Sequence, residues 1–247
     1  MTSSAPIRQS GSTRSLSSLQ NQFMDGFRMT ILAVIALIFA GWPSPSAGLT
    51  APFGEVHPEQ RAENRSLLVI DEGIADYLPL IETLLAENGH PPDSLMRVTT
   101  AGADPVWQIR ESLAELGEVN AVHIISHGAA GRLWFAGREI DAASLRDPAQ
   151  RERIASWSRF LSEDAEILLY GCRVGAGPEG GRLIQMLSRL TGAAVAASDN
   201  LTGNGGDWDL ERSTGKIRTV ALRADDYAGT LGDFSTADFN GDTLPDP

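Results

Sequence analysis

The chain contains one cysteine, Cys172, and one lysine, Lys216. A single cysteine cannot form an intramolecular disulfide or a cysteine-based zinc site, so Cys172 is a buried residue, an intermolecular partner or a reactive thiol. Lysine and arginine together number 20 against 32 acidic residues, which gives a net charge of −12. No basic surface for nucleic acid is expected from this composition, and we predict no nucleic-acid partner.

Long hydrophobic runs are also missing, because the apolar segment 29–40 is shorter than the roughly 20 residues that span a bilayer. It follows a serine-rich segment with Arg8, Arg14 and Arg28, as the core of a signal peptide does. We therefore predict that residues 1–48 are a signal peptide cleaved near Gly48, which makes the protein secreted or cell-surface. The alternative is an uncleaved N-terminal anchor, in which case the chain contacts a membrane.

The full chain of 247 residues has room for one domain and a tail. Residues 49–65 hold proline, glycine and charge without periodicity and are predicted to be a linker. Short apolar runs then alternate with segments of helical spacing, as in parallel sheets covered on both faces. The predicted strands are 67–70, 121–126, 167–170 and 193–197, with a weaker candidate at 95–100.

Helix boundaries are marked by standard capping residues. Asp104–Pro105 and Asp147–Pro148 predict two helix starts, and Gly89 and Gly192 predict two helix ends. The apolar positions of the four predicted helices begin at Ile74, Val106, Ile154 and Leu183, with Leu78, Leu84 and Leu85 on the first helix's inner face and Leu161 in the third helix. Residues 131–140 predict a hairpin turning at Ala136 and Gly137, and 216–222 a last edge strand. The pattern predicts an α/β fold, a three-layer α-β-α sandwich with a mostly parallel central sheet over residues 66–224.

Two predicted strands are followed by reactive side chains. His127 and Gly128 follow the strand 121–126, and Cys172 and Arg173 follow the strand 167–170. Active residues of parallel sheets gather past the carboxyl ends of strands, so His127 and Cys172 are expected at one edge. A thiol beside an imidazole is the minimum for cysteine nucleophilic catalysis, and backbone N–H groups at Gly128 and Cys172 are candidates for holding an oxyanion. The alternative is a buried cysteine and a turn histidine with no catalytic role.

The segments HIISHG and ILLYGC resemble the caspase-like cysteine peptidases, the clan of caspases, legumains and gingipains. More closely, VIDEGIADY, AVHIISHGAAGRLWF, ILLYGCRVGAGPEG, LTGAAVAASDNLTG and GGDWDLERSTGKI are similar to a bacterial family called domain of unknown function 4347. That family is typical of the N-terminal parts of large secreted, repeat-bearing or adhesin-like proteins.

This resemblance implies a caspase-like sheet with His127 and Cys172 as the catalytic pair and Gly128 at the oxyanion. It also implies a substrate pocket at Ser198 and Asp199 that could select a basic residue, although an Asp in such a turn is often structural. His123 is expected to be a core histidine with a backbone partner, and Asp71, Asp76 and Tyr77 to be structural, with Asp76 capping a helix. Arg173 departs from the clan, and its guanidinium would favour the thiolate.

Six aspartates and no basic residue occupy the tail, residues 225–247. Asp238, Asn240, Asp242 and Asp246 have the spacing of oxygen ligands around calcium. Thr243 stands where an EF-hand has glycine, so the segment resembles instead the start of a calcium-binding repeat of β-propeller type. A plain solvated acidic tail is the alternative.

Two functions remain open from the sequence. The first is a secreted caspase-like cysteine endopeptidase or self-processing module that uses a Cys172–His127 dyad on a peptide or on its own downstream chain, with no cofactor for catalysis. The second is a non-catalytic N-terminal module of a secreted or surface adhesin-like protein. A nucleotide-binding domain is not favoured, because no phosphate loop with a lysine follows any strand.

Overall fold

The computed structural model describes residues 65–89, 93–100, 102–135 and 137–232, all within one compact unit. The predicted signal peptide or anchor, nearly all of the linker and the calcium-loop residues Asp238, Asn240, Asp242 and Asp246 lie outside these residues. None of the helices in the described part of the chain has both the length and the apolar character needed to cross a membrane.

A six-stranded sheet forms the centre of the domain, with the strand order β2-β1-β3-β7-β8-β9. Its strands are β1 (Ser66–Asp71), β2 (Ser94–Thr99), β3 (Val119–Ile125), β7 (Leu161–Tyr170), β8 (Ala194–Ala197) and β9 (Arg212–Ser213). The first five are parallel, and only β9 pairs antiparallel, with β8. All five strands predicted from apolar runs are present, and the α/β prediction is confirmed.

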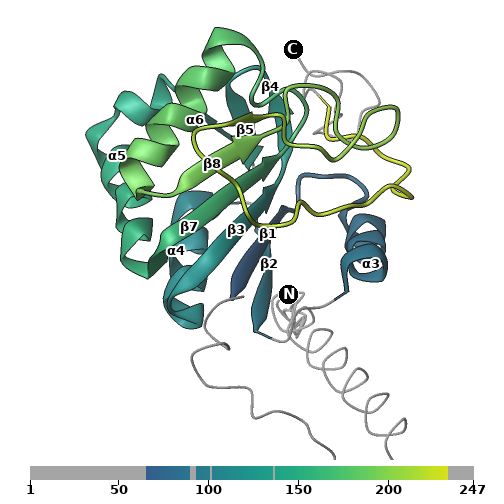
Figure 1. Ribbon diagram of the computed structural model, residues 1–247, viewed down its shortest axis with the longest axis horizontal. Helices are drawn as coiled ribbons and strands as arrows, with labels where there is room; N and C mark the ends of the chain where they lie inside the picture. The colour runs from purple at the N-terminus through teal and green to yellow at the C-terminus, as the bar shows by residue number, and fades with distance from the viewer. Residues whose placement is uncertain (1–64, 90–92, 101, 136, 233–247) are drawn as a thin grey trace, which may run out of the picture. The chain divides into compact units, whose positions relative to one another are not determined.

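Layers cover both faces of this sheet (Figure 1). Helices α4 (Pro105–Leu116), α5 (Pro148–Ala155) and α6 (Gly177–Thr191) pack on one face, where Val106, Ile109, Leu113 and Leu183 are buried. On the other face lie α3 (Tyr77–Asn88) and the long irregular segment 198–232. The second apolar cluster therefore combines sheet residues with side chains from this segment, namely Trp208, Ala224, Tyr227 and Leu231.

The capping signals place most helix ends correctly. The Asp104 carboxylate accepts hydrogen bonds from Val106 N and Trp107 N, and the Asp147 carboxylate accepts one from Gln150 N. Gly192 follows α6 in the left-handed conformation with φ +81°, which a side chain would strain. The third helix is shorter than predicted, because a 3-10 helix (Ser156–Phe160) follows α5 and Leu161 begins β7.

The inner face predicted for the first helix is partly wrong. Leu78 and Leu85 are exposed, whereas Leu80 and Leu84 are buried. Ile74 is buried in the turn before the helix, so the apolar stripe does not run through it at helical spacing. Asp76 occupies the N-cap position of α3 but makes no capping hydrogen bond through its side chain.

A second, small sheet follows β3. It contains β4 (His127–Ala129), β5 (Arg132–Phe135) and β6 (Arg138–Asp141), all antiparallel. The pairing of β5 with β6 confirms the predicted hairpin. The strand β4, which the sequence did not predict, places His127 in a strand rather than in a loop. A strand fixes the direction of a side chain more firmly than a loop does.

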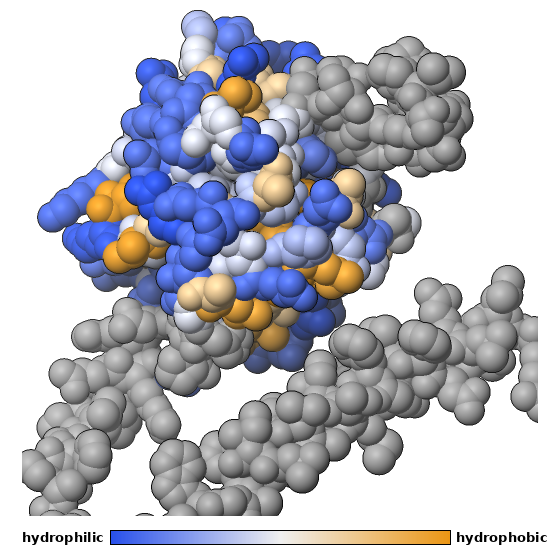
Figure 2. All heavy atoms as spheres, turned by 90° about the vertical axis from the view of Figure 1, so that its right-hand side faces the viewer, coloured by the Kyte–Doolittle hydropathy of each residue, from blue (hydrophilic) through white to orange (hydrophobic). Residues whose placement is uncertain are grey.

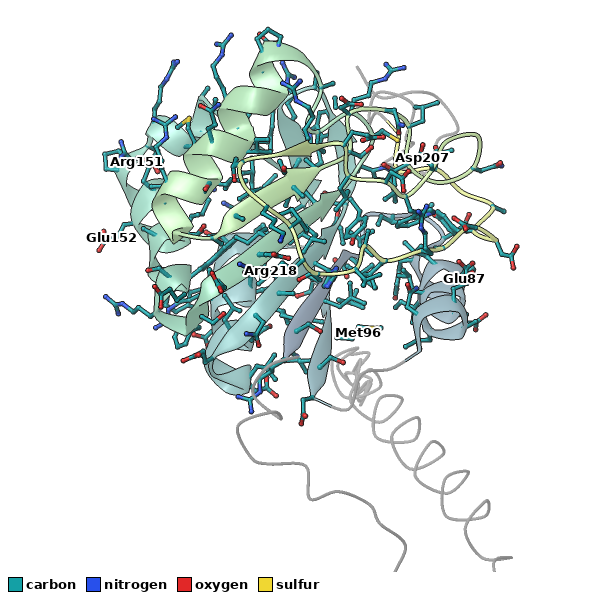
Figure 3. All side chains as sticks on the ribbon, viewed as in Figure 1. Glu87, Met96, Arg151, Glu152, Asp207 and Arg218 are labelled. Carbon is teal, nitrogen blue, oxygen red and sulfur yellow. The ribbon has the colours of Figure 1, made fainter. Side chains whose placement is uncertain are left out.

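The predicted edge strand 216–222 is wrong. β8 pairs instead with β9, and three backbone N–H groups within residues 216–222 donate hydrogen bonds to side chains of β7. The Glu166 carboxylate accepts hydrogen bonds from Arg218 N and Thr219 N, both at 2.7 Å, and the Tyr170 hydroxyl accepts one from Leu222 N at 2.9 Å. The segment crosses the face of the sheet as a covering layer, and Figure 3 labels Arg218 on it.

The irregular segment 198–232 is also anchored to α3. The carboxylate of Glu87, labelled in Figure 3, accepts hydrogen bonds from Asp225 N at 2.9 Å and Asp226 N at 3.0 Å. The Asn88 side chain exchanges hydrogen bonds with the backbone of Arg223. The face of the molecule on this side is mostly hydrophilic with scattered apolar residues (Figure 2). The hydrogen bonds of Glu87 and Asn88 hold residues 223–226 against α3.

Candidate functional site

Neighbouring strands bring the predicted pair to the same edge of the sheet. β3 and β7 are parallel and adjacent, with Ile125 opposite Tyr170 at their carboxyl ends. His127 lies two residues beyond the first position and Cys172 two residues beyond the second. Both residues therefore lie just past the carboxyl ends of adjacent parallel strands, as the sequence predicts.

Two glycines let these chain segments approach backbone to backbone. A Cβ added to Gly171 would lie 2.9 Å from Ser126 O and 3.4 Å from Gly128 Cα. A Cβ added to Gly128 would lie 3.0 Å from Gly171 C and 3.1 Å from Cys172 O. Any larger residue at position 128 would push the histidine and cysteine segments apart.

The backbone N–H groups of Gly128 and Cys172 point at one carbonyl oxygen. Leu231 O accepts a hydrogen bond from Gly128 N at 3.3 Å and another from Cys172 N at 3.1 Å. Leu231 is fully buried at the end of the described chain. Two N–H donors that converge on a carbonyl are the arrangement that stabilises negative charge on an oxygen during acyl transfer.

The Cys172 thiol lies beside the same segment. Its sulfur accepts a hydrogen bond from Thr202 N at 3.2 Å and donates to Thr202 O, with 3.5 Å between sulfur and oxygen. Thr202 O also accepts the Leu231 N–H at 3.0 Å, so the sulfur and the Leu231 backbone share one carbonyl. Burial raises the pKa of Cys172 above its usual range, although the Thr202 backbone and the Arg173 charge act to lower it.

His127 contacts the next residue of that segment. Its Nδ1 donates to Gly232 O at 2.9 Å, which places the hydrogen on Nδ1 in this arrangement. Burial lowers the pKa of His127 below 6.5, against the hydrogen bonds to the backbone of Gly232 and Gly73 and the Asp71 charge, which raise it. At neutral pH both members of the pair are therefore uncharged at rest, with the imidazole available as a base.

The other histidine of the strand is separate from this site. His123 Nδ1 shares a hydrogen bond with the Tyr170 hydroxyl at 3.1 Å, and burial lowers the pKa of His123 to about 4. The sequence predicts a backbone partner for His123, and this prediction is wrong, because the partner is the Tyr170 side chain. Asp71 is buried and accepts a hydrogen bond from the Thr99 hydroxyl at 3.1 Å, and its charge acts on His127.

Ser198 and Asp199 follow β8, one strand further along the same edge. The Ser198 hydroxyl contacts Asn200, and Asp199 N donates to the Glu211 carboxylate at 2.8 Å. This turn is linked to the segment after the cysteine by hydrogen bonds from Arg173 N to Asn200 O and from Gly175 N to Ser198 O, both at 2.7 Å. A role for Ser198 and Asp199 in selecting a basic substrate residue stays a prediction.

Thr202 and Leu231 are the site residues that sequence reasoning missed. Neither belongs to a motif of reactive residue types, and their part comes from backbone atoms that any residue carries. The one available signal was that the apolar Leu231 stands in an otherwise small and acidic stretch, AGTLGD. Over the described ranges, no group of three or more His, Cys, Asp or Glu side chains is placed to hold a metal ion.

The fold and site thus define an α/β domain with a thiol, an imidazole and two carbonyl-binding N–H groups at one sheet edge. Comparison with protein families matches residues 67–231 to the model described as Domain of unknown function (DUF4347), and the chain belongs to that family. Neither the curated proteins nor the solved structures give a match.

Proposed function

We propose that this domain is a caspase-like cysteine peptidase or self-processing module in which Cys172 is the nucleophile and His127 the general base and acid. The observation that carries the proposal is the carbonyl oxygen of Leu231 held by both Gly128 N and Cys172 N. A carbonyl in that position has its oxygen where an oxyanion would be stabilised, next to a thiol. The likeness of HIISHG and ILLYGC to the caspase-like clan supports the same assignment.

The pair would work from an uncharged resting state. Because burial raises the pKa of Cys172 and lowers that of His127, the thiol keeps its proton until attack begins. His127 then accepts that proton as sulfur bonds to the carbonyl carbon, and passes it to the leaving amine when the C–N bond breaks. Water hydrolyses the resulting thioester and regenerates the thiol.

A non-catalytic role in a secreted or surface adhesin-like protein is the second candidate. The observation that favours it is that Cys172 is 2% exposed and that its sulfur is hydrogen-bonded to the Thr202 backbone, as in a structural cysteine. In that case the Leu231 carbonyl is simply a packed backbone group. Secretion or surface exposure, membrane contact through an uncleaved segment and calcium binding by Asp238, Asn240, Asp242 and Asp246 remain proposals from the sequence in either case.

Hydrolysis that depends on both side chains separates the two candidates. The 247-residue chain is expressed with a C-terminal epitope tag, alone and with fluorescein-labelled casein, beside Cys172→Ala and His127→Ala variants. We expect cleavage of the chain or of casein by the wild type only. A folded wild-type chain that cuts neither substrate would leave the non-catalytic role.

A further inference from the structure

The last described residues are paired through backbone hydrogen bonds with the segment that begins at Thr202. Leu231 N donates to Thr202 O at 3.0 Å, and Asn204 N donates to Gly229 O at 2.8 Å. Gly203 and Thr230 form an antiparallel bridge between the two, and Asn204 Nδ2 donates to Ala228 O at 2.9 Å. This is how an extended peptide adds to an exposed edge of backbone, with main-chain hydrogen bonds that fix its register.

Close packing keeps this register from sliding. A Cβ added to Gly203, which has φ +97°, would lie 2.5 Å from Gly229 O. The absence of a side chain at position 203 therefore lets the two backbones meet. A shift of one residue would also remove Leu231 O from the N–H groups of Gly128 and Cys172.

The side chain of Leu231 fills an apolar site. It is fully buried in the cluster that also contains Tyr170, Trp208 and Tyr227. Gly232, the next residue, has its carbonyl on His127 Nδ1. The peptide bond between Leu231 and Gly232 thus has its carbonyl oxygen on the two N–H donors, and the residue that follows the bond is hydrogen-bonded to the imidazole.

We infer that the Leu231–Gly232 peptide bond is the bond this domain cleaves in its own chain, with residues 228–231 acting as a built-in substrate. The inference rests on the proposed function. Cys172 sulfur forms a thioester with the Leu231 carbonyl carbon as the C–N bond breaks, and the thiol proton passes through His127 to the amine of Gly232. Water then releases Leu231 as a free carboxylate and restores the thiol, so the domain ends at Leu231 and everything downstream is freed.

The same contacts define the class of peptide the site accepts. Ala228 and Gly229 are held through their backbone carbonyls. Gly229 leaves no room for a side chain, because an added Cβ would lie 2.4 Å from the Tyr227 hydroxyl oxygen. Leu231 is held through its side chain in an apolar cluster, where a charged residue would lose its hydration without a partner. The site therefore selects an aliphatic residue before the cleaved bond.

Identifying the new ends of the cleaved chain tests this assignment. The 247-residue chain with a C-terminal tag is followed by immunoblot, and both fragments are identified by mass spectrometry. We expect a C-terminus at Leu231 and an N-terminus at Gly232 in the wild type, and neither in Cys172→Ala. Leu231→Asp is expected to slow cleavage at least about 100-fold, and Leu231→Met to stay within about 10-fold of wild type.

Leu78→Asp serves as the matched control, because it makes the same substitution at an exposed leucine of α3. It is expected to cleave at the wild-type rate, whereas a Leu231→Met chain that is folded but uncut would overturn the assignment. Cleavage that needs Cys172 but occurs at another bond also overturns it and leaves the proposed function standing. A wild-type chain that cuts neither itself nor labelled casein overturns both.

Discussion

Replacing Gly128 by alanine disturbs the carbonyl-binding N–H groups without touching either reactive side chain. The added Cβ would lie 2.5 Å from Val174 Cγ2, 3.0 Å from Gly171 C and 3.1 Å from Cys172 O. The last two are backbone atoms, so the segment carrying Gly128 N must move away from Cys172. We expect a loss of about 1–3 kcal/mol in the free energy of unfolding, typical of overpacking.

The effect on chemistry should be larger than the effect on folding. Displacing one of two oxyanion donors costs about 10²–10³ in rate in peptidases, and we expect self-cleavage to slow by that factor. Urea denaturation measures the stability, and an immunoblot time course of the tagged chain measures the cleavage rate. The two measurements on one variant separate loss of fold from loss of function.

Gly192→Ala is the control for stability. Gly192 has φ +81° at the end of α6, and no atom lies within 4 Å of an added Cβ, so only backbone strain of about 1–2 kcal/mol results. This variant should be destabilised to a similar degree and cleave at the wild-type rate. A folded Gly128→Ala chain that cleaves as fast as Gly192→Ala would refute the role given to the Gly128 N–H.

Three further predictions concern the titrating groups. His127 must be neutral to accept the thiol proton, and burial holds its pKa below 6.5. The self-cleavage rate should therefore fall with acid only below pH 6.5, and a half-maximal rate at pH 7 or above would contradict this role. The pKa of His123, lowered to about 4 by burial, should appear in an NMR titration of its imidazole. Because the unfolded chain takes up this proton first, stability should fall between pH 6.5 and 4, and a titration midpoint near 6.5 would contradict the burial of the imidazole. Burial acts to raise the pKa of Glu166, but its hydrogen bonds to Thr219 and Arg218 outweigh burial, so the pKa lies below 4.5. The stabilising effect of the charged carboxylate is therefore present above pH 4.5 and lost as the pH falls through the lowered pKa. Glu166→Gln should therefore cost about 1.5–3 kcal/mol in urea denaturation at pH 7 and less near pH 3, and a cost that is the same at both pH values would argue against a charged role.

The sheet and the position of the candidate pair could be predicted because they depend on local patterns. Apolar runs bounded by caps such as Asp104–Pro105 and Asp147–Pro148 locate buried parallel strands and the helices between them. His127 and Cys172 could then be placed together, since parallel strands end at one edge. The inner face of α3 was harder to predict, because this helix packs against the irregular segment 198–232 as well as the sheet.

The rest of the site depends on contacts distant in the sequence. Residues 216–222 have strand-like composition, but the Glu166 and Tyr170 side chains accept hydrogen bonds from the N–H groups of Arg218, Thr219 and Leu222, and no strand forms there. The hydrogen bonds that Leu231 O accepts from Gly128 N and Cys172 N likewise join backbone atoms of residues far apart in the sequence. No residue type marks such a contact, so only the folded chain reveals it.

A thioester on Cys172 is the intermediate on which the proposed function depends, and trapping it is the most direct measurement. The tagged chain is incubated with hydroxylamine, which converts a thioester into a hydroxamate, and the new C-terminus is identified by mass spectrometry. The proposed function predicts a terminal hydroxamate in the wild type and none in Cys172→Ala or His127→Ala. Cleavage of Cys172→Ala at the wild-type rate, or wild-type fragments that end only in a plain carboxylate at every hydroxylamine concentration, would contradict it.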